Sequence, residues 1–144
     1  MRTLFLIVLF ASVALADGAS DHVKLTGTWQ PVEGTDGVTW TLENTSNAVK
    51  ITQSQNGQKV SEFECNVAGK ECEVSDNGHK AKVSMWFNGA KLVELETRGS
   101  EVVKRVFSVV QPDDFLEVEV IPVVPGGKTE TLRFHRAQLT AAGR

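Results

Sequence analysis

The chain has 144 residues, with 15 lysines and arginines against 18 aspartates and glutamates, and a formal net charge of −3. The charges are dispersed without a basic run, which excludes a phosphate-binding stripe and argues against nucleic-acid binding. A chain of this length can bury one core, so we expect a single domain and a monomer.

Residues 1–16, MRTLFLIVLFASVALA, combine a basic start, an unbroken apolar run and a small-x-small site ending at Ala16. This pattern predicts a signal peptide that is cleaved after Ala16. The apolar run is shorter than the ~20 residues that a membrane span needs, so we expect no stable membrane insertion. Residues 17–144 would then form the mature domain, either secreted or periplasmic.

The predicted strands follow one another closely along the mature chain. Turn residues recur about every eight to twelve positions, with runs rich in Val, Thr, Phe and Leu between them, as in consecutive antiparallel strands. No long segment has helical periodicity, so we expect essentially no helix. Three Asn-Gly pairs, which begin at Asn56, Asn77 and Asn88, favour tight hairpin turns. The predicted strands are 22–31, 38–45, 47–54, 58–67, 70–75, 79–88, 90–98, 101–110, 114–123 and 128–137.

Alternation along these strands predicts one dry face opposite charged rows such as Glu117 and Glu119. A meander of about nine or ten strands exposes two edges unless it closes, so we expect an all-β, antiparallel up-and-down barrel. A two-sheet β-sandwich is the alternative. The predicted inward rows are Val83, Met85 and Phe87; Val93 and Leu95; Leu116, Val118 and Val120; and Leu132 and Phe134.

The two cysteines, Cys65 and Cys72, flank the turn-like segment NVAGKE. Export would place them where disulfides persist. If Ala68 and Gly69 form a two-residue hairpin loop, the cysteines lie opposite each other on paired strands, at a separation that a disulfide tolerates. We therefore expect a Cys65–Cys72 disulfide that pins a hairpin, and two buried free thiols are the alternative.

The first and last predicted strands carry a tryptophan and an arginine that would meet when the barrel closes. Trp29 shares a face with Gly27, and Arg136 shares a face with Phe134. Pairing the two strands places Trp29 and Arg136 on the same inner side, where a stacked guanidinium contributes about 0.5 to 2 kcal/mol. Gly27 would leave room for the ring or for a bend in the strand. These three residues have a predicted structural role in barrel closure.

The segments GTW and FHR, which contain Gly27, Trp29 and Arg136, resemble the hallmark of the calycin superfamily. In lipocalins and fatty-acid-binding proteins, Gly-x-Trp on the first strand packs against an arginine on the last. The mature chain, with LTGTW, its Asn-Gly hairpins and a final TETLRFHR, is also similar to small exported lipocalin-like proteins of acidobacterial type. The resemblance implies a lipocalin-like barrel that holds a small hydrophobic or amphiphilic ligand.

The chain departs from the fatty-acid-binding proteins in two ways. The segment between Trp29 and Trp40 is too short for their two-helix lid. The chain has no tyrosine, so their carboxylate-binding set of arginines and a tyrosine cannot be matched. Avidin-type biotin binders share LTGTW, but their pocket is not matched either.

The predicted ligand-binding residues are Arg105, Phe107, Trp86 and Met85. Arg105 shares a face with Phe107, and if that face is inward, its buried guanidinium is available to a ligand carboxylate. If Val102, Val106 and Val110 face inward instead, Arg105 lies in solvent. Trp40 and Trp86 could each line a pocket mouth, or serve in ordinary packing or at the surface.

Catalysis finds little support in the sequence. The histidines His22, His79 and His135 have no zinc-binding spacing, and no nucleophile elbow is present. We expect no enzyme activity, no cofactor and no metal. One alternative function is a cavity-free surface interaction or scaffold protein, which would dock an unknown partner through outer rows such as Val102 and Val106. A hydrolase or isomerase would require a buried polar cluster near Arg105.

Overall fold

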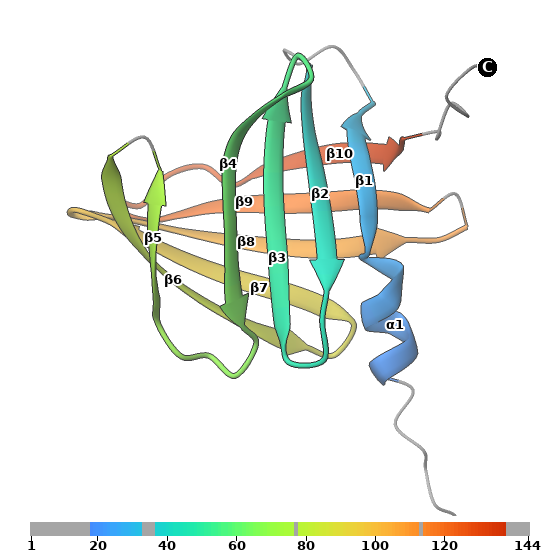
Figure 1. The fold of residues 1–144 in the computed structure, drawn as a ribbon, viewed down its shortest axis with the longest axis horizontal. Coiled ribbons are helices and arrows are strands. Elements are labelled where there is room, and N and C mark those ends of the chain that lie inside the picture. The colour runs from blue at the N-terminus through green and yellow to red at the C-terminus, as the bar shows by residue number, and fades with distance from the viewer. Residues whose placement is uncertain (1–17, 33–36, 77, 113, 138–144) are drawn as a thin grey trace, which may run out of the picture.

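The computed structural model describes residues 18–32, 37–76, 78–112 and 114–137 (Figure 1). The predicted signal peptide with its cleavage site at Ala16, and Asn77 with its predicted turn, lie outside the described residues. Within these ranges the chain forms one short helix followed by ten strands. The elements are α1 (Gly18–Lys24), β1 (Gly27–Pro31), β2 (Val38–Asn44), β3 (Ala48–Gln55), β4 (Gln58–Asn66), β5 (Cys72–Asp76), β6 (His79–Asn88), β7 (Lys91–Arg98), β8 (Glu101–Val110), β9 (Phe115–Val124) and β10 (Glu130–Arg136).

The ten strands form one antiparallel sheet that curls into a nearly closed barrel. Its order is β4-β3-β2-β1-β10-β9-β8-β7-β6-β5, so each strand pairs with its chain neighbours except at β4 and β5. The first and last strands pair with each other, which aligns Trp29 with Arg136. The predicted up-and-down barrel is confirmed, and the two-sheet sandwich is wrong.

Tight turns set the register of the hairpins. Between β3 and β4, Asn56 and Gly57 have φ angles of 51° and 78°, and a type I′ turn requires positive φ at both positions. Between β6 and β7 the turn after Asn88 has only two residues, so Phe87 lies opposite Leu92. Such registers determine which side chains face the inside of the barrel.

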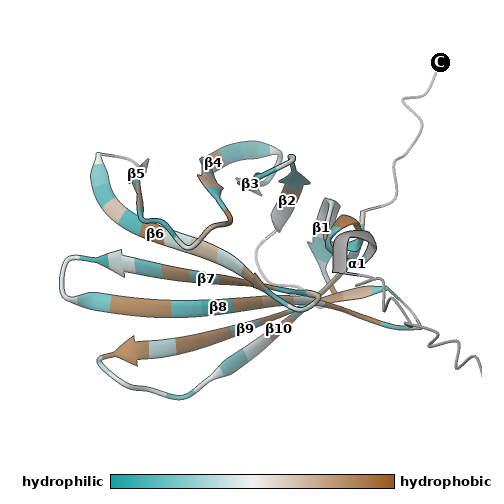
Figure 2. Cartoon of the chain, turned by 90° about the horizontal axis from the view of Figure 1, so that it is seen from below, coloured by the Kyte–Doolittle hydropathy of each residue, from teal (hydrophilic) through white to brown (hydrophobic). Residues whose placement is uncertain are grey.

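Alternate residues of the strands point into the barrel and form its core. Figure 2 shows this alternation as bands of hydrophobic and hydrophilic residues along β8 and β9. All but one of the largest fully buried side chains are apolar, and Glu94 is the exception. They are Trp29, Phe107, Leu42, Ile51, Met85, Leu92, Leu116, Glu94, Val83 and Val118.

The structure corrects the predicted face of β7, for which alternation placed Val93 and Leu95 inside. Leu92 lies inside instead, with Glu94 on the same face. Val93 is also buried, at 4% exposed, but it lies on the outer face, aligned with Trp86 and Val106. The pattern misleads because apolar side chains occur on both faces of β7. The hairpin register decides the face, since Phe87 points inward and is aligned with Leu92. The other predicted inward residues all belong to the core or pack against it.

The helix α1 is a second correction, because no helix was expected and the first strand was predicted to begin at His22. The strand β1 begins at Gly27, and α1 leads into it at the lower end of the barrel in Figure 1. A seven-residue helix is too short to show a periodic pattern, and tertiary contacts hold it. The His22 ring stacks on Phe87 with centroids 3.6 Å apart, and Gly89 O accepts a hydrogen bond from Nε2 at 2.9 Å. Over the described ranges, no helix is long and apolar enough to cross a membrane.

Candidate functional site

Trp29 and Arg136 meet at one end of the barrel, where β1 pairs with β10. Trp29 is fully buried, and its indole N–H donates a hydrogen bond to Leu25 O at 3.0 Å. The guanidinium carbon of Arg136 lies 4.3 Å from the centroid of the Trp29 ring. The same guanidinium donates to Thr26 O at 2.9 Å and to Lys24 O at 2.6 Å. One cation therefore holds together the indole, the end of α1 and the start of β1.

Gly27 provides the space for this guanidinium. Its φ is 145°, and a Cβ at this position would lie 2.7 Å from Nη1 of Arg136 but 4.0 Å from Nε1 of Trp29. The missing side chain thus makes room chiefly for the arginine, whereas the sequence pointed to the ring or a strand bend. The three residues predicted to close the barrel lie in contact with one another.

A small hollow lies between α1 and the closed end. Its empty volume is about 180 Å³, including space open to solvent. Because this volume includes open solvent and ligand pockets begin near ~300 Å³, the enclosed part of the hollow is too small for a drug-sized ligand. Its lining residues are His22, Leu25, Thr26, Leu42, Asn44, Val49, Phe87 and Leu92.

The barrel interior also contains charged side chains from β7 and β8. Glu94 is aligned with Met85 on β6 and with Arg105 on β8, so all three face inward. Arg105 donates from Nη1 to Oε1 of Glu94 at 3.0 Å, and the same nitrogen lies 3.6 Å from Oε2 of Glu96. Arg98 places its Nε 3.7 Å from Oε1 of Glu96. We call Glu94, Glu96, Arg98 and Arg105 the interior charge cluster.

Glu94 is the most deeply buried member of the interior charge cluster. Its side chain is 1% exposed, and its Oε2 has no hydrogen-bond partner among the described residues. Burial raises the pKa of Glu94 above 4.5; the nearby charge of Arg105 opposes the rise and the charge of Glu96 adds to it. A buried polar atom without a partner costs free energy, so this oxygen has hydrogen-bonding capacity that the fold leaves unused.

Arg105 and Glu96 face inward without being sealed from solvent. Their side chains are 22% and 17% exposed, respectively. Several apolar residues packed against the core are likewise only partly buried. They are Trp40, Phe63, Val67, Cys72, Val74, Phe87, Val109, Val120 and Leu132. Solvent therefore reaches the inner face beside the interior charge cluster, whereas Trp29 itself is fully buried.

Trp40 lies at the boundary between the dry core and the more open part of the interior. Its ring centroid is 5.7 Å from that of Phe107 and 6.4 Å from that of Phe134, both of which are buried. Trp40 itself is only partly buried. Like Phe63 and Phe87, it combines contact with the core and access to solvent.

Three of the four predicted ligand-binding residues face the interior. Met85 and Phe107 are fully buried, and Arg105 retains some exposure. Trp86 lies on the opposite face of β6, aligned with Val93 on the outside of the barrel. This position agrees with the alternative of a packing or surface role for Trp86 and not with a ligand contact inside the barrel, because successive residues of a strand point to opposite faces.

No role is predicted for Glu94 and Glu96 from the sequence, although a signal is present. In the segment LVELE both glutamates share a face with Leu92, and the two-residue turn after Asn88 aligns Leu92 with the inward-facing Phe87. Charged residues are almost never fully buried unless paired, so the outer face is the ordinary assignment for them. The hairpin register would have placed both glutamates inside.

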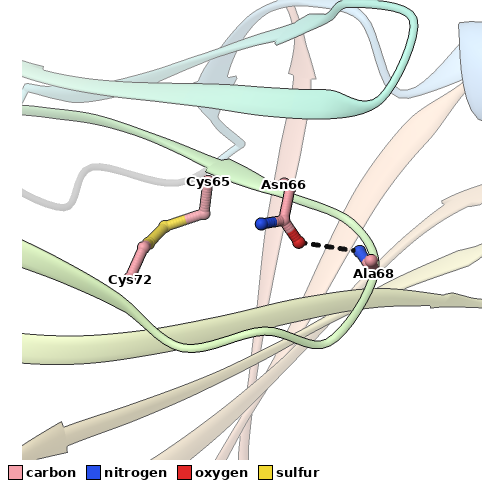
Figure 3. Close-up of a disulfide and its surroundings, with 4 residues drawn as sticks. All are labelled: Cys65, Asn66, Ala68 and Cys72. Carbon is pink, nitrogen blue, oxygen red and sulfur yellow. Dashed lines mark hydrogen bonds between the residues drawn. A yellow bond between two sulfur atoms is a disulfide. The ribbon is translucent and has the colours of Figure 1, made fainter.

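Cys65 and Cys72 form the expected disulfide, and their Cα atoms are 6.1 Å apart (Figure 3). The loop between them begins with a local turn, in which Ala68 N–H donates to the side-chain oxygen of Asn66 at 3.0 Å. The bond thus closes a short loop between the end of β4 and the start of β5.

The strands that this disulfide joins are not paired, which corrects the predicted hairpin. β4 and β5 are the two edges of the sheet. Their connecting loop bonds to β6 instead, through a bridge between Ala68 and Trp86 and a 2.9 Å hydrogen bond from Gly69 N–H to Met85 O. The disulfide therefore ties the β4–β5 seam, which is the part of the barrel wall without a hydrogen-bonded ladder.

Comparison with solved structures supports the fold, although no family model and no curated protein matches the chain. Secretory abundant heat soluble protein 4 from Ramazzottius varieornatus is 14% identical, with a TM-score of 0.65 over 80% of this chain and 96% of that one. Lipid binding protein 8 from Caenorhabditis elegans is 7% identical, with a TM-score of 0.64 over 80% and 96%. A Schistosoma mansoni fatty acid binding protein in complex with arachidonic acid is 15% identical, with a TM-score of 0.63 over 82% and 99%.

At these identities the likeness concerns the fold alone. The barrel is calycin-like, as the Gly27, Trp29 and Arg136 motif predicted. The resemblance to exported proteins of acidobacterial type is not confirmed.

Proposed function

We propose that the protein binds a small hydrophobic or amphiphilic molecule inside its barrel, for storage, transport or sequestration. The observation that carries this proposal is the partial exposure of Arg105 and Glu96 on the inner face. Solvent reaches these two side chains although both face the inside of the barrel. An interior that solvent can enter is one that a ligand can occupy, and barrels of similar strand number hold one small ligand.

The walls of this space suit an amphiphile. Partly buried apolar side chains from different strands of the barrel wall provide hydrocarbon contacts, among them Trp40, Phe63 and Val120. The interior charge cluster provides polar atoms at one position. Ligand sites typically combine a mainly apolar lining with a few polar groups that fix the orientation.

The structural neighbours support the same ligand class. One is named a lipid binding protein, and another is a fatty acid binding protein in complex with arachidonic acid. Because a fold can carry many functions, this support is an analogy of fold and is weaker than that from the exposed inner face.

We further propose that the protein acts outside the cytoplasm, secreted or periplasmic, as a monomeric domain of residues 17–144. Residues 1–16 have the sequence pattern of a signal peptide. The Cys65–Cys72 disulfide suits an oxidising compartment. The heat soluble neighbour from Ramazzottius varieornatus is secretory by name.

An enzyme is the second candidate, because the interior charge cluster is the buried polar cluster that a hydrolase or isomerase would need. We favour binding, since two of the three neighbours above are binding proteins by name. A hydrolase would release nitrophenol from nitrophenyl esters at a rate that falls in Glu94→Gln. We expect no release above that of Glu117→Gln, whose carboxylate belongs to the face opposite Leu116 and Val118.

The binding proposal is tested with protein stripped of bound lipid and titrated with the uncharged fluorescent dye N-phenylnaphthylamine. We expect saturable fluorescence with one dye per barrel. Trp40→Leu should weaken dye binding severalfold, because Trp40 lies at the edge of the interior space. Trp86→Leu is the matched control on the outer face and should bind normally. No saturable uptake by the wild-type protein would contradict the proposal.

A further inference from the structure

The interior charge cluster carries an inference about the head group of the ligand. We propose that this cluster selects an amphiphile whose head is an uncharged hydroxyl over one whose head is a carboxylate. The inference rests on the proposed function, because it names the ligand class for the same interior site. It replaces the expectation that Arg105 serves a ligand carboxylate.

Arg105 is already engaged by carboxylates of the chain itself. Its Nη1 lies 3.0 Å from Oε1 of Glu94 and 3.6 Å from Oε2 of Glu96. The second cation, Arg98, lies 3.7 Å from Glu96. While both glutamates are ionised, the two guanidinium groups and the two carboxylates cancel in charge, so an anion gains no net attraction. A ligand carboxylate near Arg105 would also lie close to two like charges, which disfavours its ionised form.

Glu94 offers the contact that a hydroxyl can use. Its Oε2 is buried and, within the described part of the chain, has no hydrogen-bond partner. A hydroxyl can donate to this oxygen when the carboxyl is ionised and can accept from it when the carboxyl is protonated. A ligand carboxylate can only accept, and an ammonium can only donate. Burial raises the pKa of Glu94, which brings its protonated form closer to neutral pH, and a hydroxyl suits both forms.

The surroundings of Glu94 also suit the first carbons of an alkyl chain. Glu94 is aligned with Met85 on one side, and Arg105 is aligned with Val120 on the other. Solvent reaches Arg105, and Nη1 of Arg105 touches Glu94. A head group that arrives beside Arg105 therefore has Glu94 within one further contact.

The inference is tested by displacing N-phenylnaphthylamine from the wild-type protein near neutral pH. The competitors are dodecanol, dodecanoate and dodecylamine, which share one chain and differ only in the head. We expect dodecanol to bind at least about tenfold more tightly than the other two, which corresponds to one good hydrogen bond to a buried group.

Variants connect this preference to the cluster. Glu94→Gln removes the carboxylate nearest to Arg105, so dodecanoate should gain affinity and the preference should fall to about threefold or less. Glu96→Gln should reduce the preference for dodecanol less than Glu94→Gln does. This second variant still tests the inference if Glu94→Gln does not fold. Glu117→Gln is the matched control, because Glu117 pairs with Arg133 at 3.5 Å on the other face of the sheet, and it should keep the full preference.

Several outcomes would overturn the inference and leave the proposed function in place. Dodecanoate could bind the wild type as tightly as dodecanol, or dodecylamine could bind most tightly. The preference could stay unchanged in Glu94→Gln and Glu96→Gln, or the dye could bind and none of the three chains displace it. If the dye itself does not bind, the inference and the proposed function fail together.

Discussion

The barrel contains two inward-facing arginines whose surroundings differ. Arg136 stacks on Trp29, donates to two main-chain carbonyls and places its Nε 3.7 Å from Oδ2 of Asp114, so its contacts join segments of the chain. Arg105 contacts the side chains of Glu94 and Glu96, of which Glu94 is buried and Glu96 is partly exposed. Arg105 is aligned with Val120 on β9, and Val120 is aligned with Glu130 at the start of β10. Arg136 is the last residue of β10, so the two arginines lie toward opposite ends of this strand. The same residue type thus closes the barrel at one end and forms a polar site toward the other.

The largest expected effect is at the closed end. Trp29→Ala should lower the free energy of unfolding by about 3 to 5 kcal/mol, because a fully buried indole is replaced by a cavity. Urea unfolding followed by circular dichroism measures the loss. Trp86→Ala removes an indole from the outer face and should cost clearly less. Equal and small losses in both variants would contradict the closing role of Trp29.

The β4–β5 seam gives the next effect. Replacing Cys65 and Cys72 together by serine should lower the free energy of unfolding by about 2 to 3 kcal/mol, since the bond closes a short loop. Urea unfolding with and without reductant measures the loss, and reductant should no longer matter in the variant. Insensitivity of the wild-type protein to reductant would show that the seam needs no covalent tie.

A smaller effect is expected at Gly27, where a substitution can distinguish a clash with Arg136 from backbone strain. Gly27→Ala should cost about 1 to 2 kcal/mol, because the added Cβ would meet the guanidinium and the residue has positive φ. Gly99→Ala is the control, since Gly99 also has positive φ, at 59°, with no atom within 4 Å of an added Cβ. Gly99→Ala should therefore cost less, as thermal unfolding of the two variants can show. The same loss in both would remove the argument from close packing.

The smallest effect is the pH dependence of stability that comes from Glu94, the partner of Arg105. The raised pKa of Glu94 means that its contribution to stability is complete below about pH 4.5 and is lost as pH rises through the folded-state pKa. Arg105 and Glu96 face Glu94, and Arg98 contacts Glu96. Glu94→Gln resembles the protonated form, so its stability relative to wild type should increase with pH.

Urea unfolding of the wild type and Glu94→Gln at acidic and neutral pH measures this difference. Glu117→Gln should show no such trend, because its carboxylate lies on the other face. A difference between wild type and Glu94→Gln that does not change with pH would contradict the assigned burial effect.

Local signals made the closed end predictable. The spacing of Gly27 and Trp29 and the parity of Arg136 fix which side chains meet once the first and last strands pair. Asn-Gly turns and alternating apolar residues marked most strands within a few residues. The helix α1 escaped prediction because its stability depends on distant contacts, such as His22 with Phe87.

The interior charge cluster was harder to predict, because it depends on the register of three strands. Arg105 had two equally patterned faces on β8, and since Val106 and Phe107 are both buried, the alignment of Phe107 with Leu92 and Val118 decides between them. Glu94 looked like a surface residue, since charges are rarely buried without a partner. Its partner lies on the next strand, and the alignment of Glu94 with Arg105 follows only when the pairing is known.

The most direct test of a ligand site in the open part of the barrel is an amide and indole NMR titration of lipid-stripped protein with dodecanol. The chain has three tryptophans, and they report on three places: Trp29 at the closed end, Trp40 inside and Trp86 outside. We expect saturable shifts of the Trp40 indole and the Arg105 side-chain N–H signals at one dodecanol per barrel, with Trp29 and Trp86 nearly unchanged. Shifts confined to Trp86, or no saturable shifts, would contradict the account.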